Sequence, residues 1–440
     1  MTDNRRLYRG KPQVRFHTMA KPIGPTCNLD CTYCYYLSKA GLLDIEPNRK
    51  MSDEVLENFV RQYIEGHNSK EIVFSWQGGE PTLLGLDYFK RIVELQQKYK
   101  PKHSRIENDL QTNGTLLDED WCHFLRENNF LVGLSIDGPK ELHDNYRVDR
   151  AGKGTFDAVF AASTLLRKRN VPFATLSCVN YKTAKHPLEV YRFLRDEVGS
   201  KRMQFIPIVE PKVFREVAPQ RWTADQMPIL GSTAAEPGTK DSVVEEWSTH
   251  PVDFGDFLCT IFDEWLANDL GDIYVHYFDA AVETWMGRVN PLCSLAPMCG
   301  KGTAIETDGS VYCCDHYVYA DYLLGNIEDK SLKEMVLSEE QERFGTDKER
   351  TLPQRCRHCK WQFACFGECP KNRFIRTPQG EAGLNYLCEG LRKFFAHIDE
   401  PIRKIITEHL GEEVRIPDAT GSKLKLSDFK PVIDKLRKKK

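Results

Sequence analysis

The sequence lacks an apolar run long enough to cross a bilayer, and its polar start lacks the apolar segment of a secretory signal peptide. An excess of one charge is lacking too, since 61 Lys and Arg against 64 Asp and Glu leave a formal net charge of −3. This balance gives no reason to expect nucleic acid or an anionic membrane as a partner. Internal repeats and low-complexity blocks are also missing. We therefore expect a soluble globular protein that stays in the cytoplasm.

Cysteine, by contrast, is abundant, with 15 residues in 440. Disulfides are rare in the reducing cytoplasm, so metal or redox chemistry is the better explanation for so many thiols. Three of them, Cys27, Cys31 and Cys34, have the spacing Cys-x3-Cys-x2-Cys. Three thiolates leave one iron of a 4Fe-4S cluster with an open coordination position, beside which Tyr33 would place its ring. The competing interpretations are an incomplete zinc knuckle and three unrelated buried thiols.

Segments typical of strands and helices alternate up to about residue 207. The expected strands are 13–19, 72–76, 106–111, 131–136, 173–179 and 203–207, and the expected helices are 53–65, 87–99, 118–128, 156–168 and 187–197. Ser52 is the expected N-cap of the first helix. Such alternation implies a parallel sheet with right-handed crossovers. Six strands favour an α/β fold with an open (β/α)6 partial TIM-type barrel over a closed eightfold barrel.

Changes in composition divide the rest of the chain. Residues 210–251 are rich in Pro, Thr, Ser and Glu and are expected to form an irregular connection, followed by a helix at 254–268. Nine of the 15 cysteines lie between 293 and 388, which indicates a smaller Cys-rich iron-sulfur module. The predicted parts are a barrel at 1–209, a connecting segment with helices at 210–290, the cysteine module at 291–390, and a C-terminal helix with a solvated basic tail at 391–440.

Polar and glycine residues follow the predicted strands at the rim where α/β barrels build their active sites. Gln77-Gly78-Gly79-Glu80-Pro81 follows the second strand, and Ser135 lies near the end of the fourth. Glycines let the backbone approach a ligand closely, and Glu80 with neighbouring carbonyls can accept hydrogen bonds from an ammonium group. Arg147 offers a guanidinium for a carboxylate, a role that Arg150 or Lys153 could fill instead.

The cysteine loop and the glycine motif resemble those of the radical S-adenosylmethionine (SAM) enzymes. The resemblance implies that the open iron binds the amino and carboxylate groups of SAM, with Tyr33 beside it and the motif around Gly79 at the amino group. It also implies that Ser135 contacts the ribose or the methionine part, Arg147 the carboxylate and Ile208 the adenine.

The nine later cysteines exceed by one the thiolates that two fully ligated 4Fe-4S clusters need. Their spacing resembles the twin-cluster SPASM module of peptide-modifying radical SAM enzymes, and in detail that of the anaerobic sulfatase-maturating enzymes. The family pattern implies one cluster held by Cys293, Cys299, Cys314 and Cys369 and another held by Cys356, Cys359, Cys365 and Cys388. Cys313 is then the spare, although the doubled Cys313-Cys314 leaves this ligand open. Zinc is the runner-up metal, because Cys-x2-Cys is also a zinc-knuckle spacing.

The resemblance implies that the reduced cluster of the first loop passes one electron to SAM. The 5′-deoxyadenosyl radical then takes a Cβ hydrogen from a Cys or Ser of a sulfatase polypeptide, and loss of an electron and a proton gives Cα-formylglycine. Asp315 is the candidate base, its alternative role being a loop-capping Asp. Tyr36 and Gln77 are expected to line the peptide site. The auxiliary clusters are the expected electron exit, and a flavodoxin or ferredoxin is the expected electron donor.

Two other functions stay open from the sequence. One is a SPASM peptide maturase that makes a crosslink or thioether, and the other is a non-catalytic iron-sulfur electron carrier. Cys122, Cys178 and Cys259 stand apart from the motifs and are interpreted as packing residues. Both Cys and Ser remain candidates for the residue that is oxidised.

Overall fold

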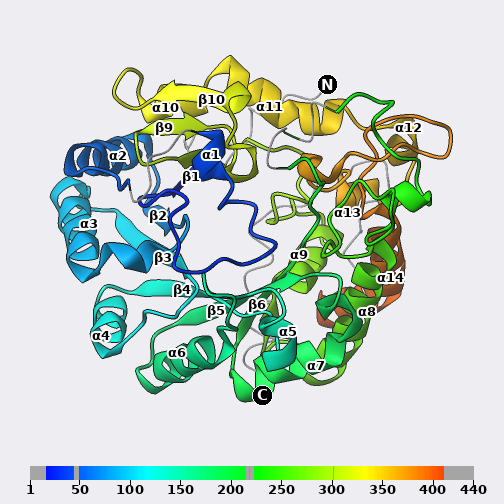
Figure 1. The fold of residues 1–440 in the computed structure, drawn as a ribbon, viewed down its shortest axis with the longest axis horizontal. Helices are drawn as coiled ribbons and strands as arrows, with labels where there is room; N and C mark the ends of the chain where they lie inside the picture. Colours follow the sequence, from blue (N-terminus) through cyan, green and yellow to red (C-terminus); the bar gives the residue numbers. More distant parts are fainter. Residues whose placement is uncertain (1–15, 44–48, 215–217, 219–221, 301, 411–440) are drawn as a thin grey trace.

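The computed structural model describes residues 16–43, 49–214, 218, 222–300 and 302–410. Six parallel strands form the central part of one curved sheet, and they confirm the predicted partial barrel (Figure 1). These strands are β1 (His17–Ala20), β2 (Glu71–Trp76), β3 (Arg105–Thr112), β4 (Phe130–Ser135), β5 (Phe173–Val179) and β6 (Arg202–Pro207). Residues 13–15 of the first predicted strand lie outside the described residues, as does the basic tail.

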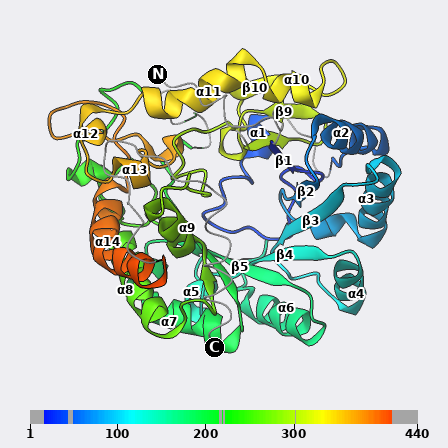
Figure 2. The same ribbon diagram turned by 180° about the vertical axis from the view of Figure 1, so that it is seen from behind.

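The helices between these strands lie on the outer, convex side of the sheet, and both views show them there (Figures 1 and 2). They are α2 (Asp53–Gly66), α3 (Leu86–Tyr99), α4 (Glu119–Glu127), α6 (Phe156–Lys168) and α7 (Pro187–Arg192), the last continuing into a π-helical turn at Phe193–Glu197. Local sequence explains them. The Ser52 side chain accepts a hydrogen bond from Val55 N at the start of α2, as predicted. The buried residues of α2 recur at helical spacing and pack on the sheet.

The cysteine-rich part of the chain adds strands to the barrel sheet, which the sequence did not predict. β8 (Gly302–Ile305) pairs in parallel with β1, and β9 (Ser310–Tyr312) and β10 (Leu323–Asn326) follow it antiparallel. The Thr18 and Thr303 hydroxyls lie 2.8 Å apart across the β1–β8 pair. At the other edge, the two-residue β7 (Tyr274–Val275) pairs with β6. The sheet therefore has ten strands in the order β10-β9-β8-β1-β2-β3-β4-β5-β6-β7.

The remaining helices are α1 (Lys39–Leu42), α5 (Lys140–His143), α8 (Pro251–Asn268), α9 (His276–Trp285), α10 (Leu332–Val336), α11 (Glu339–Arg350), α12 (Gln354–Arg357), α13 (Gln362–Cys365) and α14 (Cys388–Leu410). The helix predicted at 254–268 is α8, and the segment before it is largely irregular, as expected. α8 packs closely on α14. The two helices approach so closely at Gly390 that a Cβ there would lie 1.8 Å from the Pro251 carbonyl oxygen. No helix among the described residues is long and apolar enough to span a membrane.

The isolated cysteines differ in their surroundings. Cys122 and Cys259 are buried in the hydrophobic core, in agreement with the predicted packing role. Cys178 lies on β5, where its backbone N–H donates to Asp137 at 2.9 Å and its thiol lies close to Tyr33. Cys178 therefore borders the site described below.

Candidate active site

The segment after β1 carries the first three cysteines into the concave side of the sheet (Figure 1). Hydrogen bonds to residues 146–148 anchor it, from Asp30 N to the Val148 carbonyl and from Thr32 N to the Tyr146 carbonyl. Burial, with a smaller contribution from the neighbouring Cys34 thiol, raises the pKa of the Cys27 thiol to about 11 and that of Cys31 to about 12. The three predicted ligands therefore lie close together at the carboxyl end of β1.

A buried network lies beneath this loop. The Arg147 Nη1 donates to the Tyr33 hydroxyl at 2.9 Å, and that hydroxyl donates to the Asp137 carboxylate. The Arg147 guanidinium also lies 3.9 Å from Asp137, which is fully buried. Its positive charge lowers the pKa of all three loop thiols, against the larger effect of burial. Arg147 thus favours the thiolate forms that ligate iron.

One donor of this network is left over. Arg147 Nε is buried without a hydrogen-bond partner, and Arg147 itself is only 6% exposed. An orphaned cationic donor beside a three-thiol loop fits a carboxylate ligand such as that of SAM. Arg150 instead donates to the Cys27 carbonyl through Nε and Nη2, so of these two arginines only Arg147 keeps a free buried donor.

The glycine motif after β2 holds the cysteine loop by backbone contacts. Gly79 N donates to the Gly24 carbonyl and Glu80 N to the Thr26 carbonyl. A Cβ at Gly79 would lie 2.0 Å from the Thr26 carbonyl oxygen, so only glycine fits there. Gly79 therefore packs against the segment that leads into the cysteine loop.

The Glu80 carboxylate has a different use from the predicted one. It is completely buried and accepts hydrogen bonds from the backbone N–H and hydroxyl of Thr82, the Thr112 hydroxyl and Asn113 N, at 2.7–3.0 Å. These four donors join the loop after β2 to the end of β3. Glu80 therefore shapes the rim, and the motif's backbone carbonyls are left for an ammonium ligand.

The other predicted rim residues lie at strand ends. Ser135, the last residue of β4, accepts a hydrogen bond from Gln111 Nε2 on β3 at 2.8 Å. Gln77 follows β2, and its N–H donates to the Ala20 carbonyl at the end of β1. Ile208 follows β6 and is 8% exposed. The strands β1 to β6 thus bring these positions to the same end of the sheet as the cysteine loop.

Asp315 lies against the cysteine loop, although it comes from the distant module. It follows β9 by three residues, is 7% exposed, forms an ion pair with Lys21 and accepts a hydrogen bond from the Tyr35 hydroxyl. Burial acts to raise its pKa, but the Lys21 ammonium, His316 and the hydrogen bonds from Lys21 and Tyr35 together lower the pKa of Asp315 to about 2. The carboxylate is therefore ionised and can accept a proton.

The predicted substrate residue Tyr36 contacts the same region. Its hydroxyl donates to the Glu306 carboxylate at 2.7 and 2.8 Å, and the Lys21 ammonium lies 4.2 Å from its ring centroid. Burial raises the pKa of Glu306 to about 7. Lys21, Tyr35, Glu306 and Asp137 escaped the sequence analysis. Lys21 could have been found, because it lies just beyond the first predicted strand, at a position on the barrel rim.

Eight of the nine cysteines of the module lie in two groups of four. Burial raises the pKa of the Cys314 thiol, and the Cys369 and Cys293 thiols raise it further, while Cys293 does the same to Cys299. In the second group, Cys388 raises the pKa of both Cys356 and Cys365, and Cys359 raises that of Cys388, in each case in addition to burial.

Cys313 lies apart from both groups. It is buried in the hydrophobic core, and its carbonyl accepts a hydrogen bond from Gln341 Nε2. Of the doubled pair, Cys314 is thus the residue that lies among the other thiols.

The donor sets fit iron-sulfur clusters better than zinc. All eleven gathered ligands are thiols, in one set of three and two of four. Within the described part of the chain, no three Cys, His, Asp or Glu side chains converge as ligands of a single metal ion. A cubane binds each thiolate on a different iron and so does not require the sulfurs to converge on one point. The zinc alternative therefore gains no support.

Comparison with known families agrees with this arrangement. Residues 22–194 match the radical SAM superfamily, and residues 293–360 match the SPASM iron-sulfur cluster-binding domain. The first range contains the three-cysteine loop and the barrel rim, and the second contains Cys314 and Asp315.

Relatives match over most of the chain. A serine-type anaerobic sulfatase-maturating enzyme of Bacteroides thetaiotaomicron is 44% identical over 382 residues, covering 87% of this chain and 89% of that protein. A cysteine-type anaerobic sulfatase-maturating enzyme of Clostridium perfringens is 36% identical over 384 residues, covering 86% of this chain and 95% of that protein. The solved structure of native anSMEcpe with bound AdoMet superposes with a TM-score of 0.75 at 35% identity, over 88% of this chain and 98% of that one.

Proposed function

This chain belongs to the anaerobic sulfatase-maturating enzymes, radical SAM oxidoreductases that convert a sulfatase Cys or Ser to Cα-formylglycine, and we propose the following roles for its residues. Cys27, Cys31 and Cys34 hold the cluster that binds SAM. With SAM bound, the reduced cluster supplies a 5′-deoxyadenosyl radical, which removes one hydrogen atom from the target Cβ. The other steps belong to the protein's own side chains.

Five residues hold SAM. Arg147 binds its carboxylate, and the support is the orphaned Nε donor beside the loop. Gly79 lets the backbone carbonyls of its loop reach the amino group. Tyr33, Ser135 and Ile208 complete the pocket at the rim.

Asp315 accepts the proton that leaves the substrate when the radical is oxidised. The observation that carries this role is its contact with Tyr35 and Lys21, which brings an ionised carboxylate to the cysteine loop. Lys21 and Tyr35 act as positioning residues, because they fix the two carboxylate oxygens. Tyr36 and Gln77 line the peptide site.

The module's cysteines would hold two auxiliary clusters, which would supply an acceptor for the electron that leaves with this proton. Cys293, Cys299, Cys314 and Cys369 hold the first, which adjoins the base because Cys314 and Asp315 are consecutive. Cys356, Cys359, Cys365 and Cys388 hold the second. One electron therefore enters through SAM and one leaves through the module in each turnover.

The partners and the compartment follow from this chemistry. The substrate is a sulfatase polypeptide, and the solved structure of anSMEcpe with AdoMet and the Kp18Cys peptide, at 34% identity and a TM-score of 0.75, supports a peptide-sized substrate. A flavodoxin or ferredoxin supplies the electron. The cytoplasm is the compartment, because all 15 cysteines are free and a reducing environment keeps them so.

A peptide assay tests the function. Reconstituted, reduced enzyme is incubated with SAM and a sulfatase-derived peptide carrying Ser, or Cys in a parallel sample, and the product is weighed. Formylglycine formation from Ser removes two hydrogens, and the 44% identity to a serine-type relative makes this the first peptide to test. Release of 5′-deoxyadenosine excludes a mere electron carrier. Turnover of a crosslinking substrate with both peptide masses unchanged would indicate another peptide maturase instead.

A further inference from the structure

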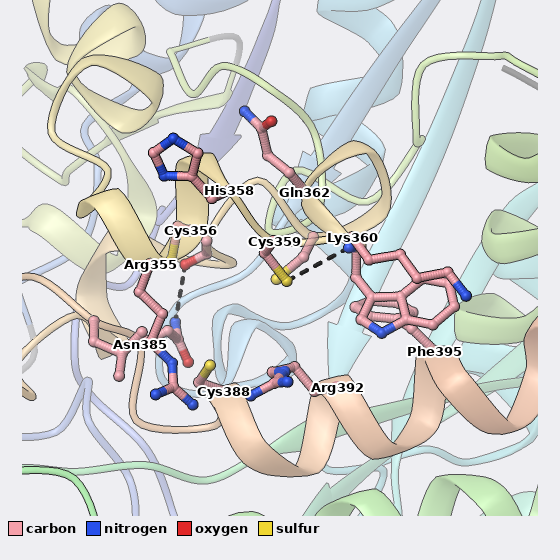
Figure 3. Close-up of a pocket in the computed structure, with 14 residues that line it drawn as sticks. Arg355, Cys356, His358, Cys359, Lys360, Gln362, Asn385, Cys388, Arg392 and Phe395 are labelled. Carbon is pink, nitrogen blue, oxygen red and sulfur yellow. Dashed lines mark hydrogen bonds between the residues drawn. The ribbon is translucent and has the colours of Figure 1, made fainter. Parts of the chain in front are cut away.

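The thiols of the second auxiliary group open onto the protein surface. Cys356, Cys359, Cys365 and Cys388 line a cavity of about 450 Å³, and each of them is partly exposed (Figure 3). The cavity lies between α12, α13 and the start of α14. A cluster bound by these four thiols would lie next to solvent.

The charged residues that line this cavity are all basic. They are Arg355, Lys360 and Arg392, accompanied by His358, and no Asp or Glu lines it. The run Arg-Cys-Arg-His-Cys-Lys at 355–360 supplies most of this charge, although the whole chain has a formal net charge of −3. The positive rim is therefore a local feature of the surface around these thiols.

The two arginines of the rim have no carboxylate partner. No ion pair joins Arg355 or Arg392 to an acidic residue in the described part of the chain, whereas Lys360 lies 3.5 Å from Asp399. Cys388 is the first residue of α14, and the two arginines lie on either side of it (Figure 3). Arg392 is exposed. Their guanidinium groups are thus available to an anionic partner.

The cations near the first auxiliary group are buried. There Lys348 is 1% exposed, and its ammonium donates to the Cys293 and Ser294 carbonyls. Arg373 is also buried and donates to the Lys348 and Gly367 carbonyls. These two cations are buried and donate hydrogen bonds to backbone carbonyls. Arg355 and Arg392 lie near enough to the second group to lower the pKa of Cys388, but Arg392 is exposed, so its charge also reaches the surface where a partner would dock.

We infer that the rim of Arg355, Lys360 and Arg392 is the docking surface for an acidic one-electron carrier protein with a flavin or iron-sulfur centre. The docked, oxidised carrier takes up the single electron that left the substrate, so the cluster returns to its oxidised state and the carrier is reduced by one electron. No covalent bond to the enzyme forms or breaks in this step, and a flavin carrier reduced to its neutral semiquinone takes its proton from solvent. The inference rests on the proposed function, since that function makes the module an electron exit.

Electron transfer between purified proteins tests the inference. Holoenzyme reduced in advance, without SAM or peptide, is mixed with oxidised flavodoxin, and flavin absorbance is followed in a stopped-flow instrument at increasing salt. We expect a second-order rate that falls as salt rises. Charge reversal in Arg355→Glu/Arg392→Glu should lower the low-salt rate by about tenfold or more and remove most of the salt dependence. Unchanged rates and salt dependence in this variant would overturn the inference.

Controls separate docking from damage to the cluster. Arg126→Glu/Lys168→Glu makes the same charge change on exposed residues near the ends of α4 and α6, remote from the rim (Figure 1), and should leave the rate unchanged. Cytochrome c, a basic one-electron acceptor, should not be slowed by reversal at the rim. Equal slowing of both acceptors would mean impaired electron delivery and would refute docking. Iron content and the auxiliary reduction potentials are measured on each variant, and Arg355→Gln/Arg392→Gln replaces any charge-reversed protein that loses iron.

The two proposals can fail separately. The stopped-flow experiment contains neither SAM nor peptide, so a missing formylglycine product leaves its result standing. Conversely, formylglycine formation with no effect at the rim overturns only the docking surface.

Discussion

Tyr35 donates a hydrogen bond to Asp315, a residue 280 positions further along the chain. The tyrosine directly follows the last cysteine of the first loop, and the aspartate directly follows a cysteine of the module. This contact thus joins the segment of the first cysteine loop to the carboxylate that we propose as the proton acceptor. This relationship leads to the first two predictions.

Replacing Tyr35 by Phe should uncouple SAM cleavage from oxidation of the peptide. The Asp315 carboxylate loses a donor, so we expect formylglycine formation to fall by roughly tenfold, in line with the 1.5–3 kcal/mol typical of a hydrogen bond to a charged group. Release of 5′-deoxyadenosine should continue. Tyr99→Phe is the matched control, because its hydroxyl bonds Glu57 on the outer helices. Parallel loss of both products in Tyr35→Phe would contradict a positioning role.

Asp315→Asn should have a larger effect of the same kind. An amide does not accept the substrate proton, so we expect peptide oxidation to fall by about 100-fold or more while SAM cleavage continues. The ratio of 5′-deoxyadenosine to formylglycine, measured by liquid chromatography and mass spectrometry, reports the uncoupling. Undiminished peptide oxidation would remove Asp315 from its role as base.

The doubled cysteines provide a matched pair of variants. Cys314→Ala should lose about one cluster's worth of iron and sulfide, because it removes a thiol that lies among Cys293, Cys299 and Cys369. Cys313→Ala should keep the full iron content, since its side chain packs in the core. Iron analysis and electron paramagnetic resonance of the reduced proteins measure the difference. The reverse pattern would make Cys313 the ligand.

Arg147 and Asp137 should behave as a coupled pair. Arg147→Gln leaves the buried Asp137 without its counter-charge, so we expect a loss of roughly 3–5 kcal/mol in stability and slower cluster assembly. The double variant Arg147→Gln/Asp137→Asn should recover part of that stability but not SAM binding. Urea unfolding and equilibrium dialysis with SAM provide the two measurements. Additive destabilisation in the double variant would show that the two residues act independently.

Asp109 on β3 should make stability depend on pH. Burial raises the pKa of Asp109 to about 6, although the Ser75 hydroxyl donates to its carboxylate and acts in the opposite direction. The folded protein therefore binds this proton more tightly than the unfolded chain, so the contribution is fully present below about pH 4 and is lost as pH rises through about 6. Asp109→Asn should gain about 1–3 kcal/mol over the wild type at pH 8 and little at pH 4. Urea unfolding at both pH values tests this, with the exposed Asp157→Asn as control.

The barrel could be predicted from the sequence because each of its parts has a local signal. Ser52 before an amphipathic run predicts a helix start, and an apolar run followed by Gln77-Gly78-Gly79 predicts the end of a strand. The cysteine groups could be predicted as well, because the spacing of the cysteines and the family pattern depend only on which residues occur and in which order along the chain. Their gathering in the structure follows those spacings.

Contacts between distant segments could not be predicted in the same way. The pairing of β1 with β8 joins residues such as Thr18 and Thr303, and nothing in either short strand specifies the other. The use of Glu80 was misjudged because a Gly-Gly-Glu run looks the same whether its carboxylate faces a ligand or its own loop. Lys21 was missed because its partner, Asp315, lies in another part of the chain.

The β1–β8 pairing has a consequence for how the protein can be divided. Because β8 covers one side of β1, a chain ending before residue 291 would present β1 as a bare edge strand with unpaired backbone groups. Such edges promote association between molecules. The barrel without its module should therefore aggregate, so we expect the two parts of this chain to depend on each other for a closed sheet.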